Sequence, residues 1–140
     1  MYPIAINYLA VIAAAILAFG FGALWYGVVL AKPWMAAQGF TKEELEADSR
    51  SMGTTFGLTF MGYLFLALVM AMLVDLTKPM DVNQGLWLGL MAWFGFMVPV
   101  NLTSVLYARK GLSLFVIDAV YQLIIALMIA GVNLSFSAWV

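Results

Sequence analysis

Four continuous apolar stretches constrain the fold of this 140-residue chain more than any other feature. They cover residues 6–30, 54–76, 84–106 and 113–134. A transmembrane helix needs about 20 apolar residues, and at roughly 1.5 Å per residue even the shortest stretch would extend about 33 Å as a helix. Transmembrane strands would instead alternate in segments of about ten residues. We therefore predict an all-α membrane protein with four transmembrane helices in an up-down-up-down bundle.

Composition agrees with a single integral membrane domain over residues 1–140. The chain is 66% hydrophobic and 9% charged, whereas soluble domains have about 25% charged residues. The lipid bilayer is thus its expected partner, and a net charge of -1 gives no attraction to nucleic acid. The sequence has no cysteine and no histidine, which excludes disulfides, iron–sulfur clusters and the usual zinc sites. We expect no metal, no cofactor and no catalytic site.

The connection between the first two stretches, residues 31–53, contains most of the charge. Pro33 is suited to begin a short helix and Gly39 to end it. Thr41 and Glu44 then have the spacing of a capping box, which predicts a second short helix. We expect a short amphipathic helical segment between transmembrane helices one and two.

The distribution of basic residues predicts the orientation. Five of the six Lys and Arg residues fall in the first and third connections: Lys32, Lys42, Arg50, Arg109 and Lys110. The second connection has Lys78 alone. By the positive-inside rule, the first and third connections are cytoplasmic and both termini lie outside the cytoplasm. The expected location is the bacterial inner (cytoplasmic) membrane.

A stripe of small residues marks a packing face on the first helix. Ala10, Ala14, Ala18 and Gly22 are each four positions apart, and small residues at this spacing let helices approach closely in membranes. The stripe would meet another helix of the same chain or a second copy of it. A homo-oligomer or another membrane protein therefore remains a candidate partner.

We expect Asp118, in the fourth stretch, to be the lone acid of the membrane interior. An Asp at the centre of a membrane helix costs about 2.5–3.5 kcal/mol, and less toward an end, so it needs a partner or a proton. Gln122 and Asn133 fall on the same helix face, and Tyr121 lies beside it. Antiparallel pairing places Asn101 of the third stretch at a similar depth.

Two interpretations of this polar group remain open. In the functional one, Asp118 is a titratable or ligand-binding carboxylate, with Asn101, Gln122 and Tyr121 as its hydrogen-bond donors and Lys32 within snorkelling reach. In the structural one, Asp118 only holds helices together through the same partners. Three nearby aromatic residues also allow two interpretations: Trp25, Tyr26 and Trp34. They are either interfacial anchors or a cap over the polar pocket.

Several motifs together resemble a bacterial membrane family catalogued as domain of unknown function 1761. They span essentially the whole chain: Asn7-Tyr8-Leu9-Ala10-Val11, Gly22-Ala23-Leu24-Trp25-Tyr26, Lys32-Pro33-Trp34-Met35, Gly39-Phe40-Thr41, Trp93-Phe94-Gly95-Phe96, Asp118-Ala119-Val120-Tyr121 and the late stretch from Gly131 to Trp139. The resemblance implies a small four-helix integral membrane protein and no known activity. This chain has Gly27-Val28 where the family often has Ser-Pro, and Gln122 where it often has His.

Three functions are compatible with the sequence. The first is a non-enzymatic structural or accessory bundle, because no catalytic constellation is recognisable. The alternative is a small oligomeric transporter or channel that uses Asp118 as its proton or cation site. A third hypothesis is a lipid-modifying enzyme with Asp118 and Tyr121 as acid–base groups.

Overall fold

The computed structural model describes residues 3–48 and 52–137. Their helices are, in chain order, α1 (Tyr8–Leu24), the π-helical turn η1 (Trp25–Val29), α2 (Ala31–Gln38), α3 (Lys42–Glu46), α4 (Met52–Thr77), α5 (Val82–Ala92), the π-helical turn η2 (Trp93–Met97), α6 (Val98–Tyr107) and α7 (Leu112–Ser135). No strand occurs in these two ranges.

Four of the continuous helical segments are long and apolar enough to cross a membrane. They are Tyr8–Val29, Met52–Thr77, Val82–Tyr107 and Leu112–Ser135. The prediction of an all-α protein with four such helices is confirmed. The helices α2 and α3 occupy the first connection, and the capping box of Thr41 and Glu44 is present at the start of α3. Arg50, one of the basic residues counted above, lies outside the described residues.

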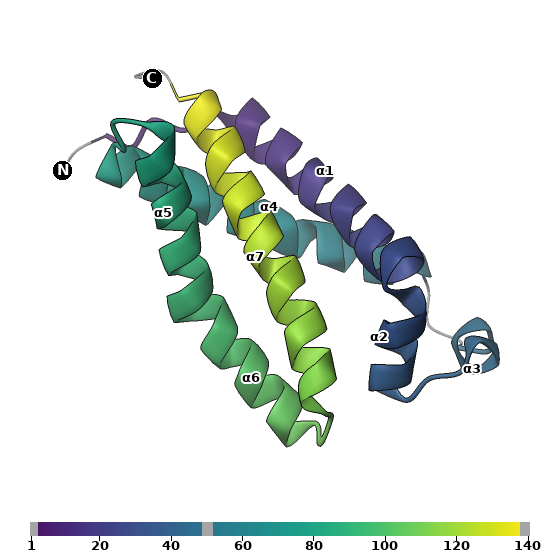
Figure 1. Cartoon of the computed structure of the whole chain (residues 1–140). Coiled ribbons are helices and arrows are strands. Elements are labelled where there is room, and N and C mark those ends of the chain that lie inside the picture. Colours follow the sequence, from purple (N-terminus) through teal and green to yellow (C-terminus); the bar gives the residue numbers. More distant parts are fainter. Residues whose placement is uncertain (1–2, 49–51, 138–140) are drawn as a thin grey trace.

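Helix α7 is the centre of the fold. It packs against α1, α4, α5 and α6, and α1 also packs against α4. Figure 1 shows α7 between α1 on one side and the α5–α6 segment on the other, with α4 behind. Both ends of the chain lie at the same end of the molecule as the turn between α4 and α5. We call this the terminal end, and the end with α2, α3 and the α6–α7 turn the loop end.

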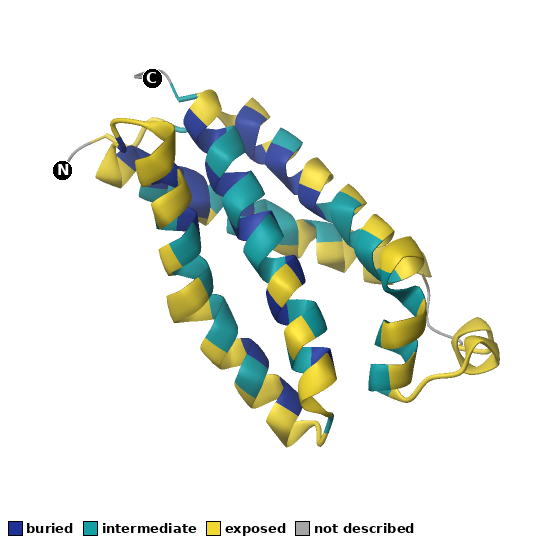
Figure 2. Cartoon of the chain, in the orientation of Figure 1, coloured by how far each residue is buried: buried dark blue, intermediate teal, exposed yellow. Residues whose placement is uncertain are grey.

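The hydrophobic core lies toward the terminal end, as the dark blue segments in Figure 2 show. It is built from small residues on α1 and α4 packed against larger ones on α7, including Ala14, Ala18, Ala67, Ile125 and Ile129. The alanine stripe of α1 is therefore a packing face within this chain. Its small side chains let α1 approach α4 and α7 closely, which provides the van der Waals contact that lipid-solvated helices need.

The bundle is open at its loop end. Residues 52–59 of α4 are all exposed, and α4 diverges from α6 after meeting α5 near the turn that joins them. A regular up-down-up-down bundle would instead keep these neighbours in contact along their length. The short turn between α4 and α5 keeps these two helices close at the terminal end only. Beyond that end, α4 packs against α1 and diverges from α6.

Two π-helical turns interrupt the first and third transmembrane segments, and each begins with tryptophan. In η1 the Leu30 amide donates to the Trp25 carbonyl oxygen at 2.8 Å, and in η2 the Val98 amide donates to the Trp93 carbonyl oxygen. Pro99 is the second residue after η2 and lacks the amide that an α-helix would donate to Gly95. Such turns are frequent at functional sites. Both of these lie beside α7, η1 near the loop end and η2 midway along the third segment.

Candidate functional site

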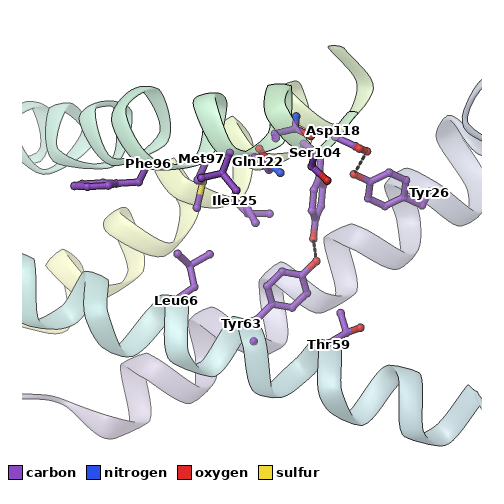
Figure 3. A pocket seen from close by; sticks show the side chains of 14 residues that line it. Tyr26, Thr59, Tyr63, Leu66, Phe96, Met97, Ser104, Asp118, Gln122 and Ile125 are labelled. Atoms are coloured by element: carbon purple, nitrogen blue, oxygen red, sulfur yellow. Dashed lines mark hydrogen bonds between the residues drawn. The ribbon is translucent and has the colours of Figure 1, made fainter. Parts of the chain in front are cut away.

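A cavity of about 570 Å³ occupies the open end of the bundle. Figure 3 shows side chains from four segments around it. Tyr26 comes from η1, Tyr63 from α4, Asn101 from α6, and Asp118 and Gln122 from α7. The cavity lies between α4 and the η2–α6 segment, where these elements diverge. The fold thus gathers polar groups that are far apart in the sequence into one wall.

The Asp118 carboxylate is held by a tyrosine of the first transmembrane segment. The Tyr26 hydroxyl donates to Asp118 Oδ1 at 2.7 Å, drawn as a dashed line in Figure 3. The Tyr26 ring meets Trp34 of α2 edge-on, with 5.6 Å between ring centroids. Because Tyr26 also packs edge-on against Tyr121 at 5.0 Å, its ring is fixed on two sides. Asp118 itself is neither fully buried nor exposed, so a molecule in the cavity can reach it.

A second tyrosine pair links α4, α7 and α1. The Tyr121 hydroxyl donates to the Ala18 carbonyl oxygen at 3.1 Å and lies 2.6 Å from the Tyr63 hydroxyl. With its own hydrogen committed to Ala18, Tyr121 accepts the hydrogen of Tyr63. Gly22 makes this arrangement fit, because a Cβ atom at that position would lie 2.6 Å from the Tyr121 hydroxyl oxygen. The α1 glycine therefore has a specific role in positioning the cavity wall.

Two tryptophans hold the α7 backbone on either side of Asp118. Trp25 Nε1 donates to the Ile117 carbonyl oxygen at 3.2 Å, and Trp93 Nε1 donates to the Ala119 carbonyl oxygen at 2.8 Å. Each tryptophan is the first residue of a π-helical turn. An indole N–H in an apolar setting needs an acceptor, and here both acceptors belong to the residues that flank the acid. The depth of Asp118 relative to the first and third transmembrane segments is thereby fixed.

The two amide side chains of the site differ in their hydrogen bonding. Asn101 is 8% exposed and donates from Nδ2 to the Phe115 carbonyl oxygen at 3.2 Å. It ties α6 to α7 and does not donate to Asp118. Gln122 has a buried Oε1 that finds no hydrogen-bond partner among the described residues. This oxygen is an acceptor that a ligand in the cavity can satisfy.

The structure brings together most of the residues singled out from the sequence. Asp118, Tyr121, Gln122 and Asn101 all line the cavity, but Lys32 is exposed and does not line it. The aromatic residues considered as interfacial anchors have inward partners instead. Trp25 and Tyr26 bond to α7, and Trp34 packs on Tyr26. Of the three, only Tyr26 lines the cavity, so the anchor and cap interpretations both stay predictions.

The expectation that Asp118 is the lone interior acid is wrong. Asp75, in the last turn of α4, is only 4% exposed. In the sequence, Asp75 lies near the end of an apolar stretch and close to Lys78, a position typical of a residue at the membrane interface. It is buried because the segment before α1 folds across it, and the Ala5 amide donates to Asp75 Oδ2 at 3.2 Å. Tyr63 also escapes prediction, since one tyrosine in an apolar helix carries no signal of its hydroxyl partner.

The chemistry of the cavity wall is acidic and aromatic. Its lining contains one carboxylate, from Asp118, and no Lys or Arg side chain. Four aromatic rings contribute to it, those of Tyr26, Tyr63, Phe96 and Tyr121. Aromatic faces attract cations, most strongly where water is excluded. The wall therefore suits a positively charged or donor-rich molecule and offers no basic side chain to an anion.

Comparison with known proteins identifies the family of this chain, and that family has no assigned activity. Residues 9–134 match the family DUF1761, described as "Protein of unknown function". No curated protein and no solved structure matches this chain.

Proposed function

This chain belongs to the DUF1761 family, and from that premise we propose that it is a non-enzymatic accessory protein of the bacterial cytoplasmic membrane that binds an organic cation around Asp118. The observation that carries the proposal is the cavity wall, which combines a single carboxylate with four aromatic rings and has no basic side chain. A ligand with a positive nitrogen near Asp118 would supply the counter-charge that a carboxylate within a membrane helix needs.

The ligand would have both a polar and an apolar part. A nitrogen-bearing hydrogen-bond donor can satisfy the unpartnered Gln122 Oε1 while its charge faces Asp118 and the ring of Tyr26. The remaining wall includes Leu66 and Ile125, which suit an apolar body. A volume of about 570 Å³ is within the roughly 300–1,000 Å³ range of small-molecule sites.

Access to the cavity is from the flank of the molecule. The cavity opens where α4 and α6 diverge, alongside helices that have the length and composition of transmembrane segments. In the proposed orientation the loop end, which contains Lys32, Lys42, Arg109 and Lys110, is cytoplasmic and both termini are outside. An amphiphilic cation would then enter sideways from the inner leaflet. Reporter fusions at residue 110 and at the C-terminus should give opposite compartments, and the same compartment would contradict this orientation.

The hydrogen bonding of the site supports binding rather than catalysis. Asp118 is the one acid of the lining, and the hydroxyl hydrogens of Tyr26 and Tyr121 are committed to Asp118 and Ala18. A general acid–base mechanism would require a second group free to exchange a proton with the substrate.

A pair of probes with equal shape and opposite charge tests the proposal. Equilibrium dialysis with the purified full chain in detergent should show saturable binding of tetraphenylphosphonium and little binding of tetraphenylborate. The cation has the charge and apolar body of the proposed ligand but no hydrogen-bond donor for Gln122, so this pair tests the charge alone. Asp118→Asn should weaken binding of the cation at least tenfold, whereas Glu46→Gln, which neutralises an exposed acid of α3, should leave it unchanged. Equal binding of both probes, or an Asp118→Asn variant with unchanged affinity, would disprove the cation site.

One observation favours transport as a second candidate function. Asp118 is incompletely buried and lines an open cavity, so a proton or cation could reach it. Four helices enclose little space, and a continuous pathway would require an oligomer of this chain. Liposomes containing the protein should then show pH-dependent cation flux that Asp118→Asn abolishes. If the wild type shows no flux but binds tetraphenylphosphonium, transport is excluded and only the binding function stands.

A further inference from the structure

The most deeply buried acid of the described chain lies at the opposite end of the fold from the Asp118 cavity. Asp75 is 4% exposed, and its Oδ2 accepts one hydrogen bond, from the Ala5 amide at 3.2 Å. Its other oxygen, Oδ1, is buried and finds no hydrogen-bond partner among the described residues. A buried carboxylate oxygen without a partner is strongly unfavourable, so an additional group is required at this position.

Asp75 lines a small cavity where three parts of the chain meet. The cavity has a volume of about 20 Å³ and is bordered by the segment before α1, the last turns of α4 and the C-terminal end of α7. Its polar lining comes from Asn7, Asp75, Asn133 and Ser137. A space of roughly 10–15 Å³ already holds one water-sized particle. The cavity is therefore suited to a single small occupant.

Asn133 and Ser137 present free acceptors to this cavity. Asn133 uses its amide hydrogens on the carbonyl oxygens of Ile129, at 2.9 Å, and Ala67, at 3.3 Å. Its side-chain oxygen remains available. The Ser137 hydroxyl donates its hydrogen to the Leu134 carbonyl oxygen, which leaves its oxygen lone pairs. The Asn7 amide donates one of its two hydrogens to the Phe136 carbonyl oxygen at 3.2 Å.

Asn7 is exposed and contributes no free acceptor. Its side-chain oxygen accepts from the amides of Leu9, at 3.1 Å, and Ala10, at 3.2 Å, and so caps α1. The cavity is thus faced by three oxygens with unused lone pairs, from Asp75, Asn133 and Ser137, and one of them carries a negative charge. Oxygen atoms of carboxylates, amides and hydroxyls are the ligands of hard cations.

We propose that this cavity is a sodium site, with Asp75 Oδ1, the side-chain oxygen of Asn133 and Ser137 Oγ as ligands. One monovalent cation balances the single carboxylate, whereas a divalent ion would leave an excess positive charge in the core. The small volume favours Na⁺ over the larger K⁺. A bound ion would join the segment before α1 to α4 and α7, because its ligands and the Ala5–Asp75 hydrogen bond come from all three.

Thermal unfolding of the wild-type chain tests the site without any substitution. The purified protein in detergent is heated in NaCl, KCl or choline chloride at equal ionic strength, and unfolding is followed by circular dichroism. Sodium should raise the midpoint by several degrees relative to choline, with a saturable concentration dependence and a smaller effect of potassium. Equal midpoints in all three salts would overturn the proposal, in favour of water if the midpoint is also independent of pH. A midpoint that depends on pH and not on sodium would overturn it in favour of a proton.

Binding of ²²Na⁺ to variants locates the ion. Asp75→Asn and Asn133→Ala should each weaken ²²Na⁺ binding at least tenfold. Ser135→Ala is the matched control, because Ser135 is exposed at the same end of α7 and bonds only within its own helix, to Gly131. Asp118→Asn should also retain ²²Na⁺ binding, which separates this site from the proposed cation cavity. Full binding by Asp75→Asn, or loss in Asp118→Asn alone, would refute the assignment.

Discussion

The Tyr26 hydroxyl and the Asp118 carboxylate, 92 positions apart in the sequence, meet in a hydrogen bond of 2.7 Å. This contact joins the first and fourth transmembrane segments at the end of the molecule where the bundle is otherwise open. It also orients the acid, since one carboxylate oxygen is occupied by Tyr26 and the other is left for the cavity. The aromatic contacts of Tyr26 with Trp34 and Tyr121 make this orientation rigid.

Removing that hydroxyl should weaken both stability and ligand binding. Tyr26→Phe retains the ring packing and loses a hydrogen bond to a carboxylate, which is worth about 1.5–3 kcal/mol in proteins and less here, because the pair is only part-buried. We expect a lower unfolding midpoint and reduced affinity for tetraphenylphosphonium. The control is Tyr107→Phe, whose side chain is 86% exposed. Equal effects of the two substitutions would contradict the role of Tyr26.

Gly22→Ala should disturb the tyrosine pair of the cavity wall. The added Cβ would lie 2.6 Å from the Tyr121 hydroxyl oxygen, so that side chain must move away from Ala18 and Tyr63. Overpacking of this kind costs about 1–3 kcal/mol. The measurement is thermal unfolding in detergent, and Gly20→Ala is the matched control, because nothing lies within 4 Å of a Cβ there. A Gly22→Ala variant as stable as Gly20→Ala would show that Tyr121 is not confined as described.

Gly89→Ala should separate α5 from α7. A Cβ at Gly89 would lie 2.9 Å from the Ala126 carbonyl oxygen, and a backbone atom cannot rotate out of the way as a side chain can. We expect a loss of stability of about 1–3 kcal/mol, measured by denaturant titration in mixed micelles. Gly95→Ala, in the same transmembrane segment but in open space, should have a much smaller effect. The reverse order of stability would indicate a different α5–α7 packing.

Trp93→Phe should loosen the support of α7 next to Asp118. The substitution removes the indole donor to the Ala119 carbonyl oxygen, and a hydrogen bond of this type contributes about 0.5–1.5 kcal/mol. Circular dichroism should report a lower unfolding midpoint, with weaker tetraphenylphosphonium binding. Trp87→Phe is the control, since Trp87 is 61% exposed on the same transmembrane segment. No difference between the two variants would argue against a specific role for the π-helical turn at Trp93.

The fold was predictable from the sequence because its dominant signal is local. Stretches of about 20 apolar residues have one stable solution in a bilayer, a helix that satisfies its own backbone hydrogen bonds. The alanine stripe from Ala10 to Ala18 likewise signals close packing through its spacing alone. The grouping of Asp118, Tyr121 and Gln122 follows from helical periodicity within one segment, and the depth of Asn101 follows from antiparallel pairing.

The remaining features depend on contacts between segments, which no local pattern encodes. The inward direction of Tyr26 depends on the π-helical turn that begins at Trp25 and on the edge contact with Trp34. The burial of Asp75 depends on the segment before α1, whose extended backbone gives no periodic signal. Lys32 has the reach to approach Asp118, but α2 leaves it exposed. The direction of the α2 backbone, and not the length of the side chain, therefore determines where the Lys32 ammonium lies.

The π-helical turns at Trp25 and Trp93 also affect how the sequences of relatives should be aligned. Each behaves as a one-residue insertion in an α-helix, so it shifts the angular phase of every later residue by about 100°. An alignment without a gap beside either tryptophan would equate lipid-facing positions with interior ones over the rest of that segment. Relatives that lack one of these insertions would be one residue shorter there and, aligned with that gap, would present the same helix face to α7.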